Sequence, residues 1–187
     1  EHNMGTLKTT NIQTITGSGT LTLGTSGETV TVPSGVTVSG SMANTPAFSL
    51  YGSGSNQSVT NSAVSTADLT GAYFDTHSGF DNTNNRWTVP SGGAGKYILG
   101  ALLGTFTASN NNSTSIIYLT VNGSIIAQNQ NSDTSGGQRH MEFGISILYD
   151  LSVGDYVELK GYSEGTSPQF RRDGNSMRLW GCRIIGA

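Results

Sequence analysis

Short runs of alternating apolar and polar residues, separated by turn residues, follow one another through the chain, and no stretch has the apolar spacing of a helix. Side chains of a strand point alternately to its two faces, so this period of two predicts half-buried strands. Short strands at close spacing, with glycine, proline and asparagine between them, are typical of a β-sandwich. The 187 residues allow one core or two small ones. The sequence therefore predicts an all-β protein.

Residues 1–46 carry the shortest of these runs, and each has only about four residues. Such strands cannot bury a face alone, so their apolar positions must meet copies from other chains, as in a trimeric fibre shaft. A flexible Gly/Ser linker is the alternative, but a linker does not need valine and leucine at alternating positions. We predict a β-rich shaft over residues 1–46, with its trimer core formed by Leu21, Leu23, Val30, Val32, Val36 and Val38.

Longer runs begin after Pro46 and predict a globular head over residues 47–187. The run Tyr97–Leu103 is apolar on both faces, which indicates a strand inside the sandwich or against a neighbouring subunit. Asn122-Gly123 tolerates positive φ and predicts a tight hairpin. Further strands are expected at Ser115–Val121, Ser124–Ala127, Gly144–Leu148, Tyr156–Tyr162 and Met177–Ile185.

Two segments of the head resemble a known family. Residues 80–97 hold an aspartate-rich turn, an aromatic strand stopped by proline, a glycine turn and a tyrosine-led strand, and residues 151–159 read Leu-Ser-Val-Gly-Asp-Tyr-Val-Glu-Leu. With Pro46-Ala-Phe48 before them and Leu179-Trp-Gly-Cys-Arg-Ile184 after them, this order resembles the globular head of complement C1q, whose fold also serves tumour necrosis factor (TNF) ligands. The resemblance implies a trimeric antiparallel jelly roll sandwich that binds partners and is not an enzyme.

The segment Thr20–Gly40 is similar to shaft segments of tail-fibre and related virion proteins of marine bacteriophages. Together the two resemblances imply a homotrimeric virion fibre protein, extracellular when assembled, whose head binds a host surface glycan or protein and whose N-terminal segment contacts other virion proteins. One alternative is a structural capsid spike, decoration or fibre-assembly protein without a receptor role. A second is a secreted trimeric ligand, which is disfavoured because neither a collagen repeat nor a signal peptide is seen.

Composition excludes several partners. Charged residues make up 11% of the chain and the net charge is -3, so no basic surface for nucleic acid is expected. No apolar run approaches the roughly 18 residues of a membrane span, so membrane insertion is not expected. The lone cysteine excludes an internal disulfide and a thiolate metal cluster. We expect Cys182 to be buried in a strand, as are Trp87 and Trp180.

No catalytic constellation is present. The histidines His2, His77 and His140 lie far apart, without metal-ligand spacing, and no serine lies in a nucleophile elbow. We therefore expect no catalytic residue, no metal ligand set and no required cofactor. Calcium is one alternative, because some heads of the resembled family bind it, and local turn hydrogen bonds are the other. The residues concerned are Asp75, Asp81, Asn82, Asn84 and Asn85.

Strand order predicts where a partner would bind. In an antiparallel head successive connections alternate between two ends, which places Asn122-Gly123 and the turn at 150–155 at the shaft end. The longer polar loops 107–114, 129–140 and 163–176 then share the far end, as binding loops on a rigid scaffold do. Amide, guanidinium and aromatic groups there suit sugars and anions, although Asn-rich loops are also simply well solvated. The predicted receptor-binding residues are Asn110, Asn111, Asn112, Gln138, Arg139, His140, Phe170, Arg171 and Arg172.

Overall fold

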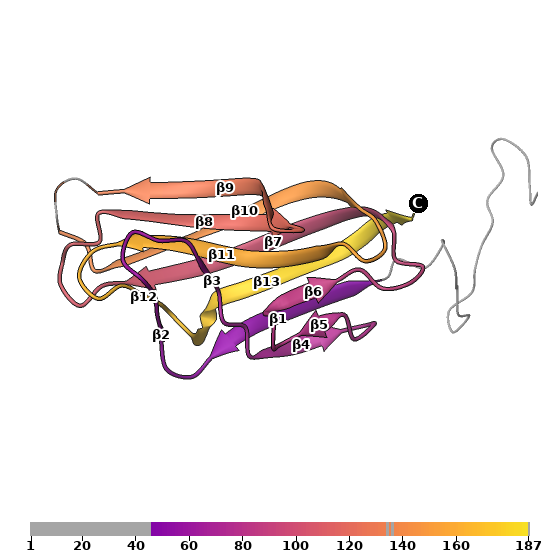
Figure 1. The fold of residues 1–187 in the computed structure, drawn as a ribbon, viewed down its shortest axis with the longest axis horizontal. Helices are drawn as coiled ribbons and strands as arrows, with labels where there is room; N and C mark the ends of the chain where they lie inside the picture. Colours follow the sequence, from indigo (N-terminus) through magenta and orange to yellow (C-terminus); the bar gives the residue numbers. More distant parts are fainter. Residues whose placement is uncertain (1–45, 134, 136, 187) are drawn as a thin grey trace, which may run out of the picture. The chain divides into compact units, whose positions relative to one another are not determined.

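A computed structural model describes residues 46–133, 135 and 137–186, and in these residues the chain is built of β-strands without a helix (Figure 1). The all-β prediction for the head is therefore confirmed. The predicted shaft core, Leu21, Leu23, Val30, Val32, Val36 and Val38, lies outside the described residues, so the shaft and its boundary at residue 46 stay predictions.

The strands in chain order are β1 (Ala47–Ser53), β2 (Gln57–Ser58), β3 (Ser65–Thr66), β4 (Gly71–Asp75), β5 (Phe80–Asp81), β6 (Arg86–Thr88), β7 (Gly95–Phe106), β8 (Thr114–Val121), β9 (Ser124–Ser132), β10 (His140–Leu151), β11 (Tyr156–Glu164), β12 (Gln169–Phe170) and β13 (Asp173–Gly186). Each strand that the sequence predicted in the head is present, and most are longer than the sequence indicated. The predicted strand at 144–148 is the middle of the twelve-residue β10, and β13 begins four residues before Met177.

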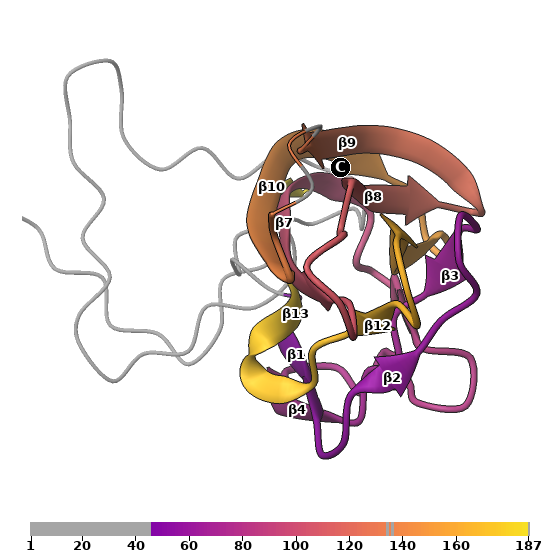
Figure 2. The same ribbon diagram turned by 90° about the vertical axis from the view of Figure 1, so that its left-hand side faces the viewer.

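These strands form two antiparallel sheets. The larger sheet has seven strands, with hydrogen-bonded neighbours in the order β2-β12-β7-β13-β1-β4. β12 pairs with the end of β7 and β13 with the rest of it, while β10 pairs with β7 along its whole length. The smaller sheet has six strands in the order β5-β6-β11-β8-β9, with β3 beside β11. Figure 2 shows β10, β7, β13, β1 and β4 following one another along one side of the head, with β8 and β9 closing it from the other sheet. The long β7 is thus the central strand of the larger sheet.

The core lies between the sheets and follows the predicted alternation. On β7 the side chains of Tyr97, Leu99 and Leu103 are fully buried, whereas Ile98 on the opposite face is 39% exposed. Trp87 stacks on Phe48 with ring centroids 4.2 Å apart and so joins the two sheets. Burying each large apolar side chain contributes about 1.5–3 kcal/mol, which makes this inner face the main source of stability.

We call the face of the larger sheet that points away from the core the outer face. Trp180 lies on it and covers the backbone of Gly100, where an added Cβ would overlap the indole ring. Trp180 and Cys182 are only half-buried, so the prediction that both belong to the core was wrong. They have the same strand alternation as core residues, but the alternation alone does not say which face is covered.

The connections separate into two ends, as the strand order predicted. At one end, which we call the base, Asn122 donates its backbone N–H to Tyr156 and its side-chain amide to Asp155 at 2.8 Å. Asp155 also accepts from the backbone of Ser152, which holds the turn before β11. Pro46 accepts from the backbone of Arg183 at the same end. The other end, which we call the loop end, carries residues 107–113, the described residues 133, 135 and 137–139, and residues 165–168.

Candidate functional site

The three loops of the loop end are hydrogen-bonded to one another through their backbones. Thr107 donates to the carbonyl of Arg139 at 2.9 Å, and Asn112 donates to that of Gln138 at the same distance. Ala108 donates to the carbonyl of Thr166, also at 2.9 Å. These bonds place the described parts of the three loops side by side at the ends of β7 to β11.

Asn112 was predicted to bind a receptor, but it is 1% exposed and holds the two sheets together from within. Its side-chain amide donates to the hydroxyl of Thr105 at 3.0 Å, and its carbonyl oxygen accepts from Ser115 at 2.9 Å and Ser163 at 3.3 Å. A buried polar group must be hydrogen-bonded, and this one is satisfied by partners on β7, β8 and β11. Asn112 cannot reach a partner molecule, and the prediction is corrected to a structural role.

Phe170 is also a correction, since its side chain is fully buried in the core. It lies on β12, which pairs with the end of β7, so it continues the apolar inner face where a polar loop was expected. Asn111 is exposed but occupied: its amide donates to the Thr166 hydroxyl at 2.8 Å and its oxygen accepts from the Thr166 backbone at 3.0 Å. Asn111 therefore fixes the conformation of the neighbouring loop.

Arg171 and Arg172 are engaged with carboxylates. Arg171 bridges Asp173 at 2.6 Å and Glu142 at 3.4 Å. Burial raises the pKa of Asp173, but hydrogen bonds from the Ser176 and Asn175 backbones outweigh it and hold this pKa below its usual value of 3.8. The interactions of Arg171 and Asp173 tie β10 to the start of β13.

The Arg172 side chain is 18% exposed, which contradicts its assignment to a free loop. Its guanidinium binds Asp68 at 2.6 Å and donates to the carbonyl of Ser53 at 3.0 Å, so it joins the end of β1 to the segment before β4. Arg171 and Arg172 are thus both engaged with groups of the chain itself.

Arg139 and His140 occupy a different environment, because both are exposed and both pack on Phe106. The guanidinium carbon of Arg139 lies 4.9 Å from the Phe106 ring centroid, and the His140 ring centroid lies at the same distance. The side-chain Nε of Arg139 donates to the carbonyl of Thr107 at 3.4 Å. Asn110 and Gln138 are exposed on the adjoining loops. With Asn111, whose side chain is bonded to Thr166, these four residues are the exposed members of the predicted set at the loop end.

The outer face divides into two halves. Towards the base, Leu148 on β10, Ile98 on β7 and Cys182 on β13 are direct cross-strand neighbours, and Leu148 is 64% exposed. Tyr73 and Phe74 on the edge strand β4 are also more than half exposed. Towards the loop end the same face carries Glu142, His140 and Gln169. We call the half nearer the base the apolar half of the outer face.

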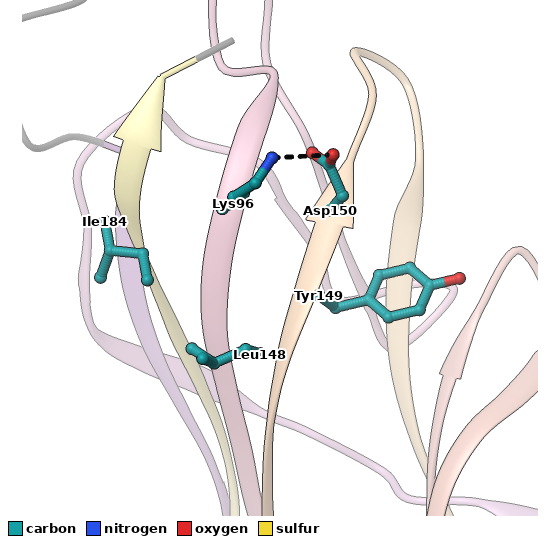
Figure 3. Close-up of a pocket in the computed structure, with 5 residues that line it drawn as sticks. All are labelled: Lys96, Leu148, Tyr149, Asp150 and Ile184. Atoms are coloured by element: carbon teal, nitrogen blue, oxygen red, sulfur yellow. Dashed lines mark hydrogen bonds and ion pairs between the residues drawn. The ribbon is translucent and has the colours of Figure 1, made fainter.

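A shallow pocket of about 360 Å³ lies on the apolar half, near the base. Leu148 and Ile184 line it, the Lys96–Asp150 ion pair, 3.3 Å long, crosses its upper edge, and the Tyr149 ring points away on the other side of β10 (Figure 3). A pocket with these walls offers apolar surface and a single charged rim to a partner. It holds no arrangement of nucleophile, base and oxyanion donors.

The acidic turns proposed as a calcium alternative are held by local donors. Asp81 accepts from the backbones of Thr83 and Asn84 and from the Asn84 amide at 2.6 Å. These bonds, with the Asn84 side chain first, lower the pKa of Asp81. Asp75 accepts from the Phe80 backbone and the Trp87 indole. Across the described residues, no group of three or more His, Cys, Asp and Glu side chains is arranged to hold a metal ion.

Comparison with known structures confirms the predicted fold of the head. Murine APRIL, in crystal structures at pH 5.0 and pH 8.0, matches with a TM-score of 0.56 at 12% and 13% sequence identity, over 74% of this chain and 98% of that chain. The globular domain of zebrafish complement 1qA matches with a TM-score of 0.53 at 13% identity, over 76% of this chain and all of that one. The head is thus a jelly roll of the C1q/TNF kind.

No protein-family model and no curated protein sequence matches the chain. In the part of the chain that the structure describes, no helix is long and apolar enough to cross a membrane.

Proposed function

We propose that the protein is a homotrimeric virion fibre protein, a bacteriophage tail fibre, whose head binds the host cell surface. The observation that carries the binding role is the loop end, where three loops are cross-linked by backbone hydrogen bonds and present exposed amide, guanidinium and imidazole groups. Rigid loops on a β-scaffold place such groups without a large ordering cost. The resemblance of Thr20–Gly40 to phage shaft segments supports the fibre assignment.

The trimer is supported by the apolar half of the outer face. Leu148, Ile98 and Ile184 are 64%, 39% and 43% exposed on neighbouring strands, beside the half-buried Trp180. A contiguous apolar surface of this kind on a folded domain usually marks an interface. The family resemblance implies a trimer, so the occupant is a second and a third copy of the same face. Light scattering of the full chain at micromolar concentration should give three times the monomer mass.

Three linked copies make even a weak site adhesive, because the second and third contacts form at a high effective concentration. Adsorption of the full chain to a panel of marine bacterial isolates tests the receptor role. Binding to at least one isolate that saturates with protein concentration supports it. A trimer that binds none of the isolates or their extracted surface glycans favours the decoration or fibre-assembly role, which antibody labelling of intact virions would then locate.

A further inference from the structure

We propose that Arg139, held on Phe106 beside His140, binds the acidic group of a surface glycan. This inference rests on the proposed host-binding function and names the ligand chemistry of the same loop end. Basic side chains are scarce, because the chain has only nine lysines and arginines.

Almost every basic side chain that the structure describes is already engaged. Five of them pair with carboxylates: Arg86, Lys96, Lys160, Arg171 and Arg172. Arg183 is buried and donates to the carbonyls of Gly92 and Ala94. Arg178 donates to the Gly174 carbonyl, the Asn175 amide oxygen and the Tyr73 hydroxyl. Arg139 is the exposed basic side chain that remains, and among the described residues its two terminal nitrogens have no hydrogen-bond acceptor.

Arg139 is also preorganised. Its guanidinium is held over the Phe106 ring, and its Nε is held by the Thr107 carbonyl, which leaves the two terminal amino groups for a ligand. A planar fork with two parallel donors matches an oxyanion bidentately, and a side chain already fixed loses less rotamer freedom on binding. His140 packs on the same ring at 4.9 Å and places a second polar group beside the fork.

The surroundings favour a sugar over other anions. Glu142 and Asp173 accept from Arg171, and Asp133 accepts from Ser135, so these loop-end carboxylates have partners of their own. The adjoining loops expose the uncharged amides of Asn110, Asn111 and Gln138, which suit the hydroxyl groups of a saccharide. A net charge of -3 disfavours an extended polyanion such as nucleic acid, whose binding needs many cations. One acidic group among neutral hydroxyls, a carboxylate or a phosphate, fits this site.

The test uses two matched pairs of probes on the full chain. Oligogalacturonate is compared with its methyl ester, and a phosphorylated mannan with its dephosphorylated form, so that the carboxylate and phosphate sources are separated. The parent should bind the acidic member of one pair and not its neutral counterpart. Arg139→Gln should weaken that binding by about tenfold or more, since it removes charge-assisted hydrogen bonds.

Two further variants make the result specific. Lys160→Gln carries the same charge change on the smaller sheet and should bind within about twofold of the parent. Arg139→Lys keeps the charge without the fork and should recover only part of the binding. Undiminished binding by Arg139→Gln, or full binding by Arg139→Lys, would overturn the assignment of the guanidinium fork.

The outcomes also separate this inference from the host-binding role. If the parent adsorbs to bacterial cells but binds neither acidic probe above its neutral counterpart, the acidic-glycan inference fails and the receptor role stands. If it binds neither cells nor probes, both fail. A matched urea midpoint for parent and Arg139→Gln excludes unfolding as the cause of lost binding, because an exposed loop side chain contributes little stability.

Discussion

Replacing Arg172 by alanine should destabilise the head by about 2 kcal/mol. The Arg172 side chain is 18% exposed, and its guanidinium makes two contacts, an ion pair with Asp68 at 2.6 Å and a hydrogen bond to the Ser53 carbonyl at 3.0 Å. A hydrogen bond between two charged groups that are shielded from water contributes about 1.5–3 kcal/mol to stability. A hydrogen bond to a neutral acceptor contributes less. Asp68 is 41% exposed and regains water when the arginine is removed, so the lower part of this range applies.

The assay is urea unfolding of the full chain, followed by intrinsic fluorescence, with the loss read from the midpoint at constant slope. Arg171→Ala is the matched control, because Arg171 is 32% exposed and both of its carboxylate partners are about as accessible as Asp68. Ion pairs of that exposure contribute about 0–1 kcal/mol. If Arg172→Ala and Arg171→Ala lower stability equally, the partial burial of Arg172 has no energetic consequence and the reasoning is refuted.

Three further predictions concern the shaft, the trimer and alkaline stability. Val30→Asp with Val32→Asp should make the N-terminal segment protease-sensitive while the head survives, because an unpaired charge in an apolar seam costs several kcal/mol; unchanged resistance would indicate a linker. Adding Leu148→Asp to these changes should yield a monomer by light scattering, whereas Val64→Asp, an exposed site on the side of the smaller sheet, should leave the trimer intact; a persistent trimer would contradict the proposed interface. Burial raises the pKa of Tyr97 from 10.0 to about 12, so between pH 10 and pH 12 the folded state keeps a proton that the unfolded chain loses, and the free energy of unfolding should fall as the pH rises. In urea unfolding of Tyr97→Phe, this loss of stability with pH should be smaller. The same loss in the variant and the parent would exclude Tyr97 as its source.

The parts of the head that could be predicted from the sequence are those set by local physics. Alternation of apolar residues placed β7, β8 and β11, because strand side chains must alternate between two faces. The hairpin at Asn122-Gly123 follows from backbone freedom, and both residues have positive φ, 51° and 78°. The assignment of loops to two ends needed only the antiparallel order of strands. Each of these inferences depends on residues close in sequence.

The candidate site could be predicted only in part, since burial depends on distant strands. Asn112 is indistinguishable in sequence from its neighbours Asn110 and Asn111, yet partners on three strands enclose it. Phe170 was read as part of a loop, but the two-residue β12 places it in the core. The binding role of the exposed residues stays a prediction.

The proposed trimer surface and the proposed Arg139 ligand site lie at opposite ends of the larger sheet, so trimer formation and ligand binding should depend on different residues. Leu148 pairs with Ile98 near the base, whereas His140 pairs with Phe106 near the loop end, eight residues further along the same two strands. At a strand rise of about 3.3 Å per residue this separation is roughly 25 Å, so the proposed trimer surface around Leu148 and the proposed Arg139 site lie far apart. Changes at distant sites usually add in free energy. Weakening one site by tenfold therefore leaves the trimer unchanged, but its effect on cell adsorption is compounded over three linked heads. An Arg139 variant should thus lose more binding to cells than to a single soluble oligosaccharide, and the ratio of the two losses measures how many heads engage the surface at once.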